Sequence, residues 1–132
     1  MKKIIIFVLL FFITSLKVFA NDWVLIAPKI YVKIDKVETN QILYWIKRLN
    51  DGTIKPIKNK KVFYSMGYQV SDCSDNTAGV LAYYVYGVDG DVLNSFVSPY
   101  VRAFRANVLE PVIPQSIMEV AHNYACSCMY QH

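Results

Sequence analysis

The chain has 132 residues, of which 55% are hydrophobic and 14% aromatic, and it carries 14 basic against 10 acidic side chains. This length suits one domain, because domains usually contain on the order of 100 to 150 residues. Three of the basic side chains lie in the first twenty positions, so the rest of the chain has a formal net charge of only +1. Such a balance gives no reason to expect a nucleic acid or an anionic membrane as partner.

Residues 1–20 have the features of a signal peptide. Two lysines form a positive start, residues 4–13 are an apolar run, and Val18 and Ala20 place short side chains at the positions that a signal peptidase reads. The run is shorter than the roughly 20 residues of a bilayer span. We therefore expect cleavage after Ala20, an exported domain over residues 21–132 and no membrane span after cleavage. No cysteine follows the cut directly, so a lipid anchor is not expected there.

Strands and turns are predicted between residues 23 and 98. Apolar and polar side chains alternate in short runs that end at turn-forming residues. The predicted strands are residues 23–26, 30–35, 41–49, 62–73, 80–86 and 91–97. In residues 41–49, one side carries Ile42, Tyr44, Ile46 and Arg48, and the other carries Leu43, Trp45, Lys47 and Leu49. The short connections predict a single antiparallel meander sheet of about six strands.

Asp89-Gly90 is the strongest hairpin signal in the chain. It predicts a two-residue type I′ turn, because Asp-Gly readily adopts positive φ at both central positions. Counting outward from this turn pairs Val88 with Asp91, Tyr86 with Leu93, Tyr84 with Ser95 and Ala82 with Val97. The stretch 100–109 contains Arg102 and Arg105 and is expected to be an exposed connection.

A helix is predicted near the end of the chain. Two prolines in residues 110–115 exclude a regular helix there, and Ser116 followed by Glu119 is a capping box that starts one. Helical spacing places five residues on one side, namely Ile117, Val120, Ala121, Tyr124 and Cys128. Cys126 falls on the flank of that side, and His122 is expected at the helix surface or the edge of the core. A sheet covered by this one helix is an α+β fold.

The three cysteines point to a disulfide, because exported proteins enter an oxidising environment in which thiols form disulfides. Cys73 lies at the end of a predicted strand, whereas Cys126 and Cys128 lie near the end of the helix, so either of the two could bond to Cys73. A bridge from Cys73 to Cys126 closes a loop of roughly 54 residues and is worth about 4 kcal/mol by chain entropy. One thiol is left over in either pairing.

The end of the chain also permits a metal-binding hypothesis. Thiolate, thioether and imidazole are the ligands that monovalent copper prefers. The residues that could supply them are Cys126, Cys128, Met129 and His132. The competing interpretation, which we prefer, is a disulfide followed by a short tail without a metal. Paired C-x-x-C motifs of the kind that bind zinc do not occur in the sequence.

No catalytic motif stands out in the sequence. It contains no P-loop, dinucleotide fingerprint or nucleophile elbow. Aspartates occur mainly where turns favour them for backbone reasons, as at Asp72, Asp75, Asp89 and Asp91. We therefore expect neither a cofactor nor enzymatic activity.

A group of lysines lies between the third and fourth predicted strands, at Lys55, Lys58, Lys60 and Lys61. The simpler interpretation is a solvated loop that discourages edge-to-edge pairing of sheets. The functional interpretation is a docking patch for an anionic partner. The tyrosines of strand 80–86 raise a similar choice, because one face of the strand is expected to be core and the other an aromatic surface of the kind found at interfaces.

Several short motifs occur in a fixed order along the chain, namely Trp23, Tyr31-Val32-Lys33-Ile34-Asp35, Tyr44-Trp45-Ile46-Lys47, Tyr68-Gln69-Val70-Ser71-Asp72-Cys73, Asp89-Gly90, Val112-Ile113-Pro114 and Ser116 through to Cys126. In these motifs and their order, the chain resembles the bacterial surface-adhesin protein E family. The motifs span nearly the whole mature domain. The resemblance implies one antiparallel sheet with a C-terminal helix tethered by a disulfide, and hence a bond between Cys73 and Cys126.

The same resemblance implies adhesion to host matrix or serum proteins and a capacity to form homodimers. This chain departs from the family's best-known member in lacking a lipidated cysteine and in having an extra thiol, Cys128. We expect an exported, non-enzymatic protein-binding domain in the periplasm or at the surface of a Gram-negative cell. The alternatives are the copper protein described above and an accessory subunit of an envelope assembly that docks through an edge strand.

Overall fold

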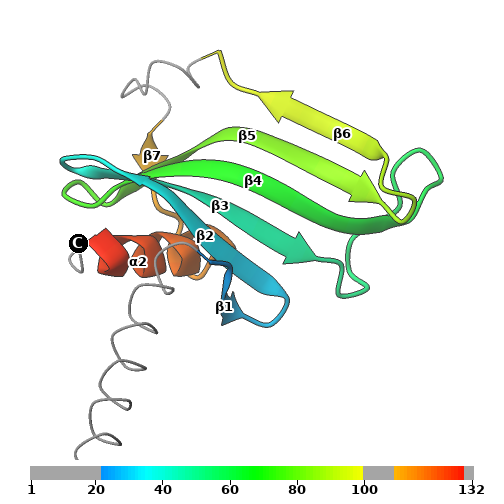
Figure 1. Ribbon diagram of the computed structural model, residues 1–132, viewed down its shortest axis with the longest axis horizontal. Helices are drawn as coiled ribbons and strands as arrows, with labels where there is room; N and C mark the ends of the chain where they lie inside the picture. The colour runs from blue at the N-terminus through cyan, green and yellow to red at the C-terminus, as the bar shows by residue number, and fades with distance from the viewer. Residues whose placement is uncertain (1–21, 100–108, 130–132) are drawn as a thin grey trace, which may run out of the picture.

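The computed structural model describes residues 22–99 and 109–129. Six antiparallel strands follow one another in a meander (Figure 1). They are β1 (Val24–Ala27), β2 (Ile30–Val37), β3 (Gln41–Leu49), β4 (Val62–Asp72), β5 (Thr77–Gly87) and β6 (Val92–Val97). A two-residue strand, β7 (Glu110–Pro111), pairs with the start of β5, and α2 (Ile117–Met129) follows it. The predicted α+β meander is confirmed.

Helix α2 packs on one face of the sheet, under β1 to β4 (Figure 1). The sheet supplies β-branched residues and a tyrosine to this interface, and the helix supplies small side chains that let it approach closely. The buried members are Ile30, Val32, Ile34, Ile42, Tyr44, Ile46, Ala121, Ala125 and Cys128. This is the main hydrophobic core, and it lies toward the β1–β3 side of the sheet.

A smaller core lies on the opposite face of the sheet. Leu43, Val70 and Leu81 are buried there, and Tyr68 and Leu109 pack against them. The register between β4 and β5 shifts beside Leu81, next to the pair that Tyr68 forms with Ala82. This shift lets the Leu81 side chain face this side of the sheet. The sheet therefore buries apolar side chains on both faces at the end where β7 joins it.

β6 and β7 lie on the same edge of β5 and run in the same direction. Val97 of β6 pairs with Ala82, and Pro111 of β7 pairs with Thr77. Both strands therefore pair with β5, β6 along its second half and β7 at its start. The exposed connection predicted for residues 100–109, with Arg102 and Arg105, falls almost entirely outside the described residues.

The hairpin between β5 and β6 differs from the prediction. Tyr84 pairs with Ser95 and Ala82 with Val97, as expected, but Tyr86 pairs with Val92. Gly90 has a φ of 85°, and Asp89 is not among the residues with positive φ, so the loop is a three-residue turn instead of type I′. A hydrogen bond from the Gly87 N–H to the Asp91 carbonyl closes it at 2.9 Å.

The capping box at the start of α2 is confirmed. The Glu119 N–H donates to Ser116 Oγ at 3.1 Å, and the Glu119 carboxylate accepts from the Gln115 N–H at 3.3 Å. The first contact satisfies a backbone donor that the helix start leaves without a partner, whereas the second reaches the residue before the cap and not the N–H of Ser116 itself. The helix begins at Ile117 because the cap residue itself lies just outside the helical hydrogen-bond pattern.

The predicted inner side of the helix is wrong at two positions. Val120 is 40% exposed, whereas His122, expected at the surface or edge of the core, is buried and only 3% exposed. The helix is rotated toward the flank that carries Cys126, because that cysteine is bonded to Cys73 at the end of β4. Periodicity counted apolar residues and could not include this covalent constraint.

Candidate binding surface

The face of the sheet opposite α2 carries a band of aromatic and basic side chains. The register places Trp45 of β3 between Lys33 and Tyr68, and Lys47 between Tyr31 and Met66. We call the following half-buried residues the aromatic face: Tyr31, Lys33, Trp45, Lys47, Tyr64, Met66, Tyr68, Tyr84 and Tyr86. No helix among residues 22–99 and 109–129 packs on it.

Ring contacts order the aromatic face. Trp45 and Tyr68 have centroids 4.7 Å apart, and Tyr64 stacks on Tyr86 at the same centroid distance with an interplanar angle of 20°. The Lys47 ammonium lies 4.7 Å from the centroid of Tyr64, within the range of a cation–π contact. These contacts hold large amphipathic side chains in fixed positions, so a partner would not have to order them on binding.

A hydrogen bond ties the aromatic face to the edge of the sheet. The Tyr68 hydroxyl donates to the Asp35 carboxylate at 2.5 Å, and so connects β4 to β2 across β3. Burial, and then this hydrogen bond, raise the pKa of Tyr68. Asp35 lies where the register between β2 and β3 shifts, so its side chain can turn toward the tyrosine. Alternation along residues 30–35 already places Asp35 on the same side as Lys33, but its pairing with Tyr68 follows only from the alignment of β2, β3 and β4.

The predicted lysine loop is an irregular connection with all four lysines exposed, namely Lys55, Lys58, Lys60 and Lys61. Its tip is a tight turn in which Ile57 and Lys60 exchange backbone hydrogen bonds of 3.0 and 2.9 Å. Lys58 and Asn59, the two residues between them, have positive φ. Such a turn directs its side chains into solvent, as a solvated loop or a docking patch would require.

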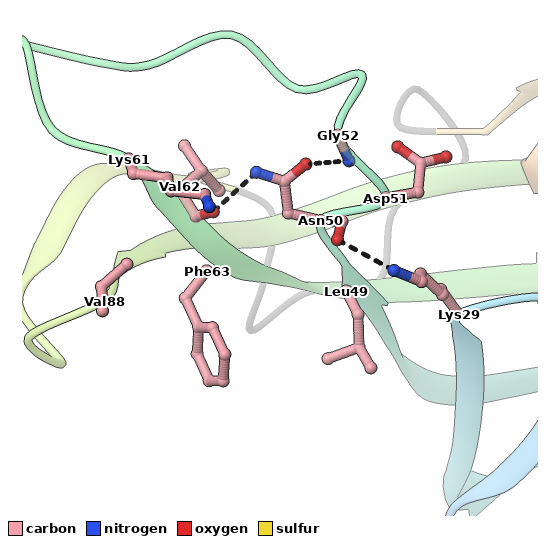
Figure 2. A pocket seen from close by; sticks show the side chains of 9 residues that line it. All are labelled: Lys29, Leu49, Asn50, Asp51, Gly52, Lys61, Val62, Phe63 and Val88. Carbon is pink, nitrogen blue, oxygen red and sulfur yellow. Dashed lines mark hydrogen bonds between the residues drawn. The ribbon is translucent and has the colours of Figure 1, made fainter.

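Asn50 closes the neck of this loop (Figure 2). Its side-chain nitrogen donates to the Val62 carbonyl at 2.7 Å, and its side-chain oxygen accepts from the Gly52 N–H at 2.8 Å. The Lys29 ammonium donates to the Asn50 carbonyl at 3.4 Å. The beginning and end of the loop are therefore held together where β3 ends and β4 begins.

Two lysines of the predicted patch have different neighbours. Lys60 forms an exposed ion pair with Asp91 of the β5–β6 hairpin, with 2.8 Å between nitrogen and oxygen. Lys61 instead lines a hollow of about 550 Å³ together with Lys29 and the exposed side chains of Phe63 and Val88 (Figure 2). Lys60 and Lys61 thus have different surroundings, and the hollow combines charged groups with apolar surface.

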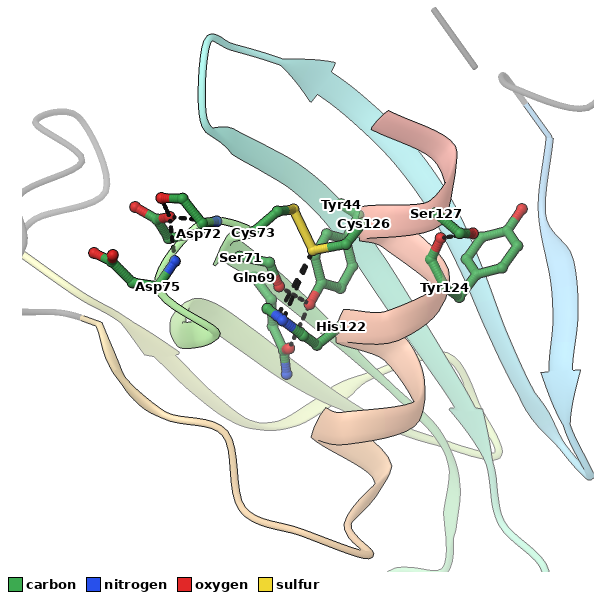
Figure 3. Close-up of a disulfide and its surroundings, with 11 residues drawn as sticks. Tyr44, Gln69, Ser71, Asp72, Cys73, Asp75, His122, Tyr124, Cys126 and Ser127 are labelled. Atoms are coloured by element: carbon green, nitrogen blue, oxygen red, sulfur yellow. Dashed lines mark hydrogen bonds between the residues drawn. A yellow bond between two sulfur atoms is a disulfide. The ribbon is translucent and has the colours of Figure 1, made fainter. Parts of the chain in front are cut away.

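The disulfide joins Cys73 to Cys126, with 5.6 Å between the Cα atoms (Figure 3). This confirms the pairing implied by the family resemblance and leaves Cys128 as a buried free thiol in the core under α2. His122 lies one helical turn before Cys126, and its Nε2 is 3.7 Å from the Cys126 sulfur. Burial lowers the pKa of His122, and the charge of Asp72 opposes this shift.

The turn that leads to Cys73 is organised by Asp72. Its carboxylate accepts from the Ser74 hydroxyl at 2.7 Å, and from the backbone N–H groups of Ser74 and Asp75 at 3.0 and 3.2 Å (Figure 3). These hydrogen bonds lower the pKa of the Asp72 carboxyl, and the one from the Ser74 hydroxyl has the largest effect. Asp72 therefore has the turn role expected from the sequence.

The residues of the copper hypothesis are not brought together in the form that it requires. Cys126 is bonded to Cys73 and has no thiolate to offer, and the Cys128 thiol is buried in the core. Met129 ends α2, while His132 lies outside the described residues. Within residues 22–99 and 109–129, no three histidine, cysteine or acidic side chains gather as a metal site would require.

No protein-family model, curated protein or solved structure matches the chain. The predicted signal peptide lies outside the described residues, and within them no helix is long and apolar enough to cross a membrane.

Proposed function

We propose that the protein is an exported, non-enzymatic binding domain, similar in role to surface-adhesin protein E, and that it contacts a protein partner through the aromatic face. The signal-peptide pattern and the family resemblance of the sequence motivate export and adhesion. The observation that carries the proposal is the aromatic face itself, an ordered group of tyrosine, tryptophan, methionine and lysine side chains on the side of the sheet opposite α2.

The composition of this face favours a protein partner. Tyrosine, tryptophan and methionine are enriched at protein interfaces, where they bury large areas and keep a polar atom for hydrogen bonding. Lys33 and Lys47 lie among these side chains, so the partner surface is expected to carry carboxylates. The candidates are host matrix proteins and proteins of the bacterial envelope.

The experiment measures binding of the exported protein to a panel of matrix proteins and to envelope extracts. The test variant combines Lys47→Glu and Tyr84→Ser, which change the charge and aromatic area of the face. We expect the affinity to fall by about tenfold or more, as at interface hot spots. The matched control is Val120→Ser on the outer side of α2, where the native side chain is already exposed, and it should bind normally.

A second variant separates the aromatic face from the lysine loop. Lys55→Glu with Lys58→Glu reverses two charges of the exposed loop and should leave binding within about twofold if the face is the contact surface. Loss of binding in this variant alone would move the site to the loop. Binding to no matrix protein and to no envelope component would reject the adhesion proposal as a whole.

A further inference from the structure

A groove of about 290 Å³ lies on the helix side of the sheet, beside the start of α2. Helix α2 packs over β1 to β4 and leaves this part of the surface open. The apolar lining includes the side chains of Ile46, Val80, Val85 and Ile117. Tyr83 forms a further wall, and its ring stacks on Phe96 of β6 with 5.7 Å between centroids. Both rings remain more than a third exposed, so the wall faces solvent.

The polar lining of the groove includes hydrogen-bond donors and one cation. Arg48 of β3 pairs with Ser65 of β4 on the groove side, and Gln69 follows on β4. Gln69 uses its side-chain oxygen to accept from the Tyr44 hydroxyl at 3.3 Å, which leaves its NH₂ group as a donor. No aspartate or glutamate lines the groove.

Arg48 is half-buried beside these apolar walls. Within residues 22–99 and 109–129, no hydrogen bond or ion pair engages its guanidinium group. The charge of Arg48 acts on one acidic residue, Asp51, whose pKa it helps to lower. That pKa is lowered first of all by the hydrogen bond from Thr53, and the Arg48 charge contributes least. The planar donor fork of Arg48 is therefore available to a carboxylate, which it fits bidentately.

We propose that this groove binds a small aliphatic carboxylate, with the carboxylate on Arg48 and the hydrocarbon chain along the apolar walls. One cation in the lining matches one negative charge, and the aliphatic side chains match a chain without polar atoms. A saturated acid of medium chain length combines one carboxylate with a flexible hydrocarbon chain, so octanoate is the probe.

The test is a titration of the ¹⁵N-labelled protein with octanoate, followed by amide chemical shifts, and a parallel titration with octanamide. The shifts are expected at β3, β4 and β5 residues around the groove, and the neutral amide should bind at least about tenfold more weakly. Arg48→Gln keeps a planar amide but removes the charge, and it should weaken octanoate binding by about tenfold to a hundredfold. Octanamide binding should stay nearly unchanged in this variant.

Lys47→Gln is the matched control. It removes one positive charge from the neighbouring position of the same strand, but its side chain lies on the aromatic face. This variant should bind octanoate normally. Equal weakening by Lys47→Gln and Arg48→Gln would show non-specific attraction to a positive protein and would overturn the proposal.

Gly67→Ala tests the floor of the groove. A Cβ at Gly67 meets nothing closer than the Ala82 carbonyl oxygen at 3.9 Å, so the variant is expected to fold. The added methyl group occupies the groove and should weaken octanoate binding. Unchanged affinity in both Gly67→Ala and Arg48→Gln, or binding only of a peptide with a free C-terminal carboxylate, would reject the assignment. This result would be independent of the protein-binding proposal, whose test variant leaves the groove residues intact.

Discussion

The Tyr68 hydroxyl donates a hydrogen bond to the Asp35 carboxylate and thereby links β4 to β2 over the intervening strand β3. The ring of Tyr68 also lies against Trp45 of that middle strand, with 4.7 Å between centroids. One side chain thus contacts two neighbours on the aromatic face. It therefore helps to fix the orientation of the Trp45 ring on this face.

Tyr68→Phe tests this link. The variant retains the ring contact and loses the hydrogen bond, which is solvent-exposed, so we expect a loss of about 1 kcal/mol or less in the free energy of unfolding. Urea denaturation followed by circular dichroism measures it. Asp35→Asn removes the charge but retains an acceptor and should cost less than Tyr68→Phe. A larger cost for Asp35→Asn would mean that Asp35 has a role apart from this hydrogen bond.

Removal of the disulfide should cost much more. The bond between Cys73 and Cys126 closes a separation of 53 residues, so Cys126→Ala is expected to lower the free energy of unfolding by about 4 kcal/mol. Cys128→Ala is the matched control within the same helix, and we expect a cost of about 1 kcal/mol. Non-reducing peptide mapping of the exported protein checks the pairing directly. A fragment containing Cys126 bonded to Cys128 would contradict the structure.

His122 should make stability depend on pH. Burial lowers its pKa, so the unfolded chain binds a proton more readily than the folded one. The stability that neutral His122 contributes is fully present above its ordinary pKa of about 6.5 and is lost as the pH falls from there through the folded-state pKa. Urea midpoints measured between about pH 7.5 and 5 should therefore fall with pH.

His122→Gln is the variant that identifies this titration, and it should flatten the dependence in that window. Three aspartates also have lowered pKa values, each held down first of all by a side-chain hydrogen bond, namely Asp51, Asp72 and Asp91. Their contributions are lost at lower pH, around and below about 4, so they do not obscure the histidine. An unchanged slope in His122→Gln would exclude this histidine as the cause.

Tyr44 supplies the polar contact of the main core. Its hydroxyl is 2.7 Å from Ser71 Oγ, and both side chains are fully buried. Burial raises the pKa of Tyr44 to about 12. Tyr44→Phe leaves the Ser71 hydroxyl without this partner and should cost about 1 to 2 kcal/mol. In a double-mutant cycle measured by urea denaturation, Ser71→Ala added to Tyr44→Phe should recover part of the loss, and strict additivity would show that the two hydroxyls are not coupled.

Local chemistry in the sequence determined much of the architecture. The bounds of β3 agree with the prediction, because alternation and the following turn residues define them. The start of α2 agrees because the Ser116 hydroxyl accepts from the Glu119 N–H and so caps the first turn. The irregular lysine loop also follows from local composition, since lysines around a proline cannot form a central strand.

Only the tertiary structure decided which side chains face the core where a long-range contact competes with periodicity. The bond from Cys126 to the sheet rotates α2, so that His122 is buried and Val120 is exposed. The β5–β6 hairpin gains a bulge that leaves Leu93 only 4% exposed, beside a glycine at position 87 whose missing side chain leaves room for it. The hydrogen bond between Tyr68 and Asp35 likewise connects strands that are not neighbours in sequence. The groove at Arg48 is lined by residues from β3, β4, β5 and α2. Alternation predicts the face on which a residue lies, whereas its partners depend on register, bulges and helix placement across the whole domain.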